Sequence, residues 1–103
     1  MGFASEILET ALPRTILVVE DEKEIQDLLA HYLRKEGFSP LLASDGETAI
    51  LKAKREKPDL ILLDILLPKA DGLEVLRAIR SDESIGRTPV VMLTAKGDET
   101  DRI

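Results

Sequence analysis

Acidic side chains and one hydroxyl follow three apolar runs in this sequence. Glu20 and Asp21 follow the first run, Asp64 follows a second, and Thr94 follows a third. Short apolar runs without polar interruption are typical of strands that are buried on both faces of a parallel sheet. Because the carboxyl ends of parallel strands lie at one edge of the sheet, we expect three carboxylates and a hydroxyl to converge there.

Three carboxylates packed together repel one another, and one or more becomes protonated unless a positive charge lies among them. A hard divalent cation supplies that charge. Mg²⁺ in particular takes carboxylate oxygens, keeps several waters and commonly binds beside phosphate. Glu20, Asp21 and Asp64 are therefore candidate Mg²⁺ ligands. Each acid taken alone has a simpler interpretation, because Asp21 precedes a helix that it could cap and Glu20 could be solvated.

The elements that position these groups alternate between strands and helices. Apolar residues at helical spacing predict helices, and Gly37 and the Lys57-Pro58 pair end two of them. Continuous apolar strands joined by helical crossovers predict an α/β fold, with a parallel sheet covered by helices on both faces. The predicted strands are 15–19, 38–43, 60–63 and 90–93, and the predicted helices are 23–36, 47–56 and 72–80.

Composition limits the classes of protein to consider. The 103 residues allow one domain, and 14 Lys+Arg against 20 Asp+Glu give a net charge of −6, which disfavours direct binding to nucleic acid. The absence of cysteine excludes disulfides and thiolate metal sites, and no apolar run is long enough to cross a membrane. These features fit a cytoplasmic protein with no membrane partner.

The first 13 residues stand apart from this pattern. Ser5 is a plausible helix cap, Pro13 would end the helix, and the apolar residues from Phe3 to Leu12 fall on one helical stripe. We expect an N-terminal extension over 1–13, which is either a leader or a short docking helix.

Three motifs in the correct order resemble those of two-component response-regulator receiver domains. Residues 60–72 resemble the phosphoacceptor segment, an apolar strand ending in Asp and followed by apolar residues, Pro and a Gly that opens a helix. Residues 16–22 resemble the first strand and acidic pair, and residues 89–95 the fourth strand and switch Thr-Ala. The resemblance implies a flavodoxin-like open sheet of strand order 2-1-3-4. Leu66 and Lys96 look most similar to receivers of bacterial winged-helix transcription regulators.

The resemblance also implies a role for each matching residue. Asp64 would be the phosphoacceptor, taking a phosphoryl group from a sensor histidine kinase. Asp21 and Asp64 would bind Mg²⁺ directly, Glu20 directly or through water, and Leu66 through its backbone carbonyl. Such a domain is a signalling switch rather than an enzyme, with at most weak autophosphorylation and autodephosphorylation activity.

The resemblance assigns the phosphoryl-binding and switch roles to Thr94, through its hydroxyl, and to Ala95, through its N–H. The Lys that the family carries after a fifth strand has no counterpart, because the sequence ends before that strand. We therefore expect a partial receiver domain over 14–103 that lacks the fifth strand. Ile16 and Val18 should then be partly exposed, the strand 90–93 should have a bare edge, and the chain should form homo-oligomers.

Three alternatives remain open at this level. A receiver fold that no longer transfers phosphate would act through oligomerisation or protein binding. A hydrolase of the haloacid-dehalogenase type would need a second Asp where this chain has Leu66. A flavin carrier would need a hydroxyl-rich phosphate loop where this chain has Glu20, Asp21 and Glu22.

Overall fold

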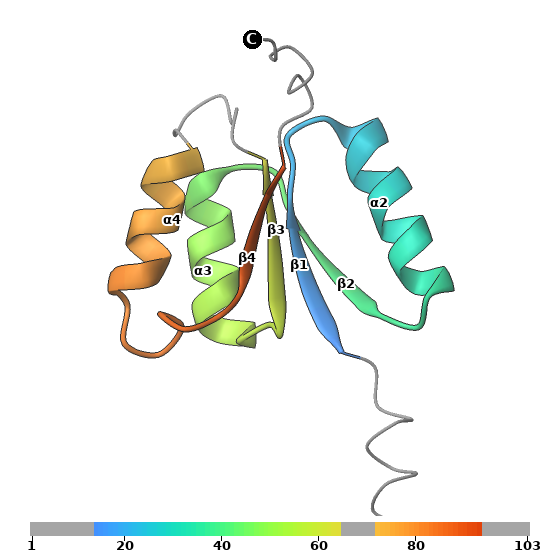
Figure 1. Ribbon diagram of the computed structural model, residues 1–103. Coiled ribbons are helices and arrows are strands. Elements are labelled where there is room, and N and C mark those ends of the chain that lie inside the picture. Colours follow the sequence, from blue (N-terminus) through green and yellow to red (C-terminus); the bar gives the residue numbers. More distant parts are fainter. Residues whose placement is uncertain (1–13, 65–71, 94–103) are drawn as a thin grey trace, which may run out of the picture.

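A computed structural model describes residues 14–64 and 72–93 of the chain. It contains four strands and three helices in strict alternation (Figure 1). In chain order these are β1 (Thr15–Val19), α2 (Lys23–Lys35), β2 (Ser39–Ala43), α3 (Gly46–Glu56), β3 (Leu60–Asp64), α4 (Gly72–Ser81) and β4 (Val90–Leu93). Each boundary lies within one residue of its sequence prediction. The expectations for Leu66, Thr94, Ala95 and segment 1–13 concern positions outside the described residues.

The four strands form one parallel sheet in the order β2-β1-β3-β4, which confirms the predicted order. β1 lies in the middle and pairs with β2 on one side and with β3 on the other, in the register Val19↔Leu63. α2 covers one face of the sheet, while α3 and α4 cover the other (Figure 1). This alternation brings the ends of β1 and β3 together at one edge.

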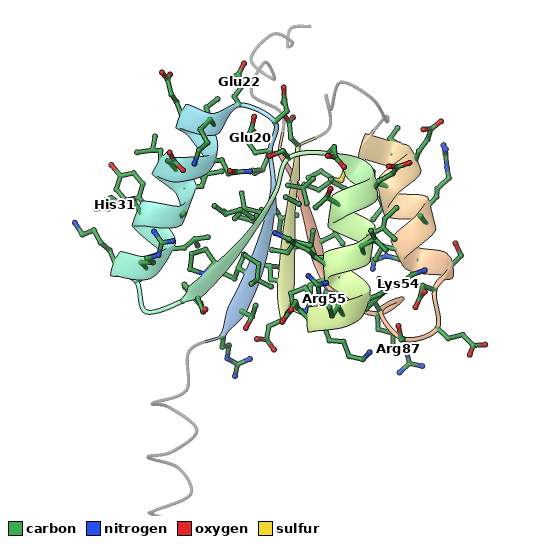
Figure 2. The ribbon with its side chains drawn as sticks, turned by 180° about the vertical axis from the view of Figure 1, so that it is seen from behind. Glu20, Glu22, His31, Lys54, Arg55 and Arg87 are labelled. Carbon is green, nitrogen blue, oxygen red and sulfur yellow. The ribbon has the colours of Figure 1, made fainter. Side chains whose placement is uncertain are left out.

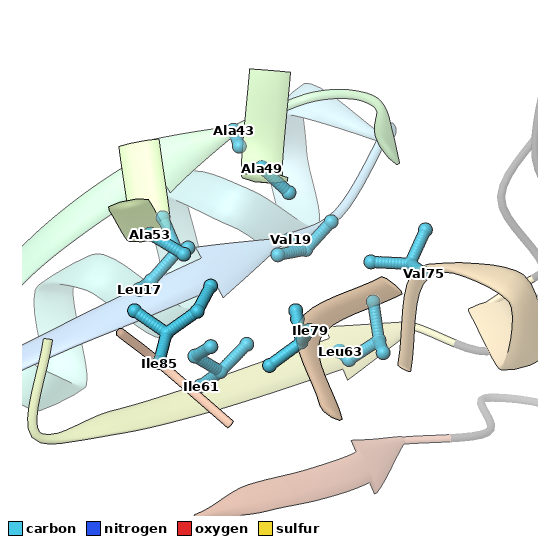
Figure 3. Packing of buried hydrophobic residues seen from close by; sticks show 10 residues of the cluster. All are labelled: Leu17, Val19, Ala43, Ala49, Ala53, Ile61, Leu63, Val75, Ile79 and Ile85. Carbon is cyan, nitrogen blue, oxygen red and sulfur yellow. The ribbon is translucent and has the colours of Figure 1, made fainter. Parts of the chain in front are cut away.

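The main core lies between the sheet and the α3–α4 layer (Figure 3). Side chains of β1 and β3 that point toward this layer are fully buried, and alanines on α3 let that helix approach the sheet closely. Ile85, in the segment between α4 and β4, closes the core from outside the regular elements. The core residues are Leu17, Val19, Ala43, Ala49, Ala53, Ile61, Leu63, Val75, Ile79 and Ile85.

Two connections show how the local sequence fixes the ends of a helix. The Asp45 side chain accepts a hydrogen bond from the Thr48 N–H at 2.8 Å and caps the start of α3. At the other end, Lys57 adopts a left-handed conformation with φ of 47°, which ends α3 before Pro58. No helix in the described ranges combines the length and the apolar character that a membrane span requires.

The expected exposure of β1 is wrong. Ile16 and Val18 are only 4% and 0% exposed, because α2 packs over β1 as well as β2. Within the described strands, the exposed large apolar side chain is Val91 of β4, which is 45% exposed, while Leu28, Tyr32 and Leu51 are exposed on the helices. β4 pairs with β3, and within the described ranges no strand lies on its other side.

The strand at the opposite edge of the sheet, β2, has fewer free backbone hydrogen-bonding groups on its outer side than a regular edge strand. The Ser39 N–H donates to the Arg14 carbonyl and the Ala43 carbonyl accepts from the Glu20 N–H, so these residues direct their backbone groups toward β1. Pro40 and Leu42 alternate with them and face outward. Pro40 has no N–H, and the Lys52 ammonium of α3 donates to the Leu42 carbonyl.

Candidate functional site

Glu20, Asp21 and Asp64 form an acidic cluster at the carboxyl edge of the sheet. Glu20 and Asp21 follow β1, and Asp64 is the last residue of the neighbouring strand β3. One carboxylate oxygen of each residue lies within 4.8 Å of the others. Glu20 and Asp64 are buried, with 5% and 8% of their surface exposed, whereas Asp21 is exposed to solvent. The convergence of these three acids confirms the expectation from the sequence.

The acidic cluster carries more negative charge than its surroundings compensate. Burial, followed by the charges of Asp64, Asp21 and Glu22, raises the pKa of Glu20 above its ordinary value. One contact opposes this shift, because the Glu22 N–H donates to Glu20 Oε2 at 3.0 Å and stabilises the carboxylate. The net upward shift indicates that a positive charge at this position would stabilise the ionised cluster.

The turn between β1 and α2 holds two of the three carboxylates in place. The Glu20 N–H donates to the Ala43 carbonyl at 3.0 Å, which extends the β1–β2 pairing by one residue. Glu22 is the N-cap of α2, and its carbonyl accepts the first helical hydrogen bond from the Gln26 N–H at 2.9 Å. Asp21 lies between these two anchored residues, so the turn holds Glu20 and Asp21 at the end of the sheet, where Figure 2 shows Glu20 and Glu22.

Basic side chains gather at the other end of the domain. Lys54 and Arg55 lie in the last turn of α3, and Figure 2 shows them with Arg87 at the end away from Glu20. Cations near a helix C-terminus interact favourably with the helix dipole. Their position keeps them away from the acidic cluster, so these three side chains do not neutralise it.

Gln26 is a site residue that sequence reasoning missed. It is 4% exposed and its Nε2 donates hydrogen bonds to backbone carbonyls at the edge of the acidic cluster. The helical pattern that predicted the helix over 23–36 counted apolar residues only, so it did not single out Gln26. The feature of the sequence that could have indicated a buried Gln26 is its position next to Ile25 in the first turns of the helix.

Leu66, Thr94 and Ala95, the remaining expected site residues, fall outside the described ranges. Within those ranges, the register pairs Asp64 of β3 with Leu93 of β4. The chain therefore leaves β4 at the same edge of the sheet as the acidic cluster.

The sequence matches the response regulator receiver domain family over residues 16–103. The chain belongs to this family. The match spans all four strands and the acidic cluster, so it agrees with the sheet order and with the place of the three carboxylates. A haloacid-dehalogenase hydrolase and a flavin carrier are thereby excluded as the family of this domain.

Similar proteins include a curated bacterial regulator and solved receiver domains. The chain is 48% identical over 90 residues to the alkaline phosphatase synthesis transcriptional regulatory protein PhoP of Bacillus subtilis (strain 168). That match covers 87% of this chain and 37% of the relative, so this receiver domain spans little more than a third of that protein's length.

Two solved structures show the same fold. The N-terminal domain of a response regulator receiver protein from Methanoculleus marisnigri JR1 is 41% identical, with a TM-score of 0.78 over 81% of this chain and 68% of that one. The receiver domain of the sensor histidine kinase PA1611 from Pseudomonas aeruginosa PAO1 is 37% identical, with a TM-score of 0.80 over 88% of this chain and 75% of that one. The latter structure has a magnesium ion coordinated in its active site cleft.

Proposed function

We propose that this receiver domain takes a phosphoryl group from a sensor histidine kinase onto Asp64 and thereby switches a downstream output. The observation that carries the proposal is the acidic cluster, in which three carboxylate oxygens lie within 4.8 Å of one another at the carboxyl ends of β1 and β3. The alternative is a receiver fold that no longer transfers phosphate and acts through oligomerisation or protein binding.

The donor set fits Mg²⁺. Three hard carboxylate oxygens from Glu20, Asp21 and Asp64 approach one another closely, and the exposed side of Asp21 leaves room for the waters that Mg²⁺ retains. We propose that these residues and the backbone carbonyl of Leu66 hold the ion. When bound, Mg²⁺ would neutralise charge on the phosphoryl oxygens and on the attacking carboxylate.

The chemistry proposed for the chain's own residues is an in-line displacement. One Asp64 carboxylate oxygen forms a bond to phosphorus as the P–N bond of the kinase phosphohistidine breaks, and the imidazole keeps that electron pair and is protonated. The Thr94 hydroxyl and the Ala95 N–H would donate hydrogen bonds to the transferred group. Phosphoryl transfer depends mainly on positioning and charge stabilisation, which the rigid ends of β1 and β3 favour.

The cellular location and the output of the domain are proposed from its kinase partner and from the transcriptional regulator that it resembles. A phosphohistidine donor and an output that regulates transcription would place the domain in the cytoplasm, without a membrane partner. Identity of 48% to a transcriptional regulatory protein supports an output domain, proposed to be of the winged-helix type, on a longer parent protein. The receiver itself, with a net charge of −6, would not bind nucleic acid directly and would have at most weak autodephosphorylation activity.

We propose the division into an extension over 1–13 and a receiver unit over 14–103. We also propose that the 103-residue chain forms homo-oligomers. The exposed Val91 side chain on β4, beside an unpaired strand edge within the described ranges, supports self-association. Sedimentation of the chain at micromolar concentration tests this, and a compact monomer that unfolds cooperatively would contradict it.

Acetyl phosphate and intact-protein mass spectrometry test the phosphoacceptor. In the presence of Mg²⁺ we expect the mass of one phosphoryl group on the wild-type chain and on Asp27→Asn, which changes an exposed acid of α2. Asp64→Asn should remain unmodified. Modification that persists in Asp64→Asn would refute the assignment, and no modification of the wild type would favour the alternative function.

A further inference from the structure

Gln26 is buried beside the acidic cluster without belonging to it. In the described ranges the buried polar or charged side chains are Glu20, Gln26 and Asp64, and Gln26 is the neutral one. Burying an amide is unfavourable unless its polar atoms form hydrogen bonds. Its Nε2 donates to the Glu20 carbonyl at 3.0 Å, to the Ala43 carbonyl at 3.2 Å and more weakly to Ser44 Oγ at 3.4 Å.

These contacts require a donor at the end of the Gln26 side chain. A backbone carbonyl carries no hydrogen and can only accept, so the amide nitrogen must face Glu20 and Ala43. The reversed amide would place its oxygen against two carbonyl oxygens. An apolar side chain of the same length would leave both carbonyls without this donor.

The hydrogen bonds fix both sides of the Glu20 backbone. The Glu20 N–H donates to the Ala43 carbonyl, and the Glu20 carbonyl accepts from Gln26. That carbonyl belongs to the peptide group that joins Glu20 to Asp21, so its orientation determines the direction in which Asp21 leaves β1. Gln26 thus connects the first turns of α2 to the ends of β1 and β2 by hydrogen bonds. The bond at the end of β1 is made to Glu20, next to Asp21, and these two residues carry two of the three carboxylates.

We propose that Gln26 is a positioning residue for the Mg²⁺ site, which fixes the peptide between Glu20 and Asp21 so that both carboxylates face Asp64. This inference rests on the proposed function. Gln26 would act through the Glu20 and Ala43 carbonyls to which it donates, and not as a ligand of the ion or of the phosphoryl group. Its loss should weaken Mg²⁺ binding because the turn over residues 20–22 becomes free to rotate, while the sheet and its core stay intact.

The test compares Gln26→Met with the wild type in the full 103-residue chain. Methionine has nearly the same length and removes the donor. Titration with MgCl₂, followed by the NMR shifts of backbone amides, should give a dissociation constant about 3- to 10-fold higher in the variant. Hydrogen exchange at the amides of Glu20 and Glu22 should be faster in the variant without metal.

Arg80→Met is the matched control. Its guanidinium donates to the backbone carbonyls of Gly86 and Thr88, at 3.1 and 2.7 Å, between α4 and β4. This variant also loses a donor to two carbonyls, but its Mg²⁺ affinity should stay within about twofold of the wild type. If Gln26→Met fails to fold, Gln26→Asn, which is one methylene too short to reach both carbonyls, carries the same comparison.

The outcomes separate this inference from the proposed function. An unchanged dissociation constant in the Gln26 variant, or an equal loss in Arg80→Met, overturns the positioning role. If the wild type shows no Mg²⁺ response, the proposed function fails, and hydrogen exchange then decides the role of Gln26. Faster exchange at Glu20 and Glu22 in the variant supports it, and unchanged exchange overturns it.

Discussion

Replacing Asp64 with Asn should stabilise the metal-free domain. Asp64 shares the acidic cluster with Glu20 and Asp21, at oxygen separations within 4.8 Å. Two unit charges at this distance repel by about 2–3 kcal/mol at an effective dielectric constant of about 20–40. The exposed Asp21 contributes less than the buried Glu20, and asparagine keeps the shape of the side chain. We therefore expect Asp64→Asn to raise the free energy of unfolding by about 1–3 kcal/mol.

The assay is urea unfolding followed by circular dichroism, with EDTA and again with Mg²⁺. Asp27→Asn, which removes an exposed acid paired with Lys23, controls for a general change in net charge and should shift stability by less than about 0.5 kcal/mol. Mg²⁺ should raise the free energy of unfolding of the wild type by an amount that grows with its concentration relative to Kd. The increase should be much smaller for Asp64→Asn. The reasoning is refuted if Asp64→Asn is less stable than the wild type in EDTA, or if Mg²⁺ stabilises both equally.

Three further predictions concern single residues. The raised pKa of Glu20 means that the folded state binds this proton more tightly than the unfolded state, so its contribution to stability falls as pH rises from about 4.5 through the raised value. Urea unfolding in EDTA should then show that Glu20→Gln gains more over the wild type at neutral pH than near pH 4.5, and an equal gain at both would contradict this. Gly86→Ala should lower the unfolding free energy by about 1–3 kcal/mol by thermal melts, since a Cβ there would lie 2.7 Å from the Asp82 carbonyl oxygen and 2.9 Å from that of Arg80. Lys57→Gly should raise it by about 0.5–1 kcal/mol, because glycine adopts the left-handed φ of 47° without strain, and a decrease would count against this explanation.

The site was predictable where it depended on strand ends. Glu20 and Asp64 end apolar runs, and parallel pairing of β1 with β3 brings any two such ends together. Gln26 was not predictable, since its role depends on carbonyls at Glu20 and Ala43 that meet only after the sheet forms.

The wrong expectation for Ile16 and Val18 has a similar cause. Helical periodicity shows which face of α2 turns inward, but it does not show over which strands the helix axis lies. α2 packs over both β2 and β1, and it is the helix of the described ranges that covers these two buried side chains. Among the described strands, the large apolar side chain that is exposed to solvent is Val91 of β4, which is separated from β2 by β1 and β3.

The two edge strands, β2 and β4, differ in how readily they can pair with a further strand. At β2, Pro40 offers no N–H and the Leu42 carbonyl already accepts from the Lys52 ammonium, so an incoming strand would lose one donor and one acceptor there. β4 carries no such block in its described residues, and it presents β-branched Val90 and Val91. We therefore expect a further strand, whether from the same polypeptide or from another molecule, to add beside β4 rather than beside β2. Misassembly during folding would begin on that side too. Lys52→Met would free the Leu42 carbonyl, so we expect it to make β2 a more favourable second site for aggregation.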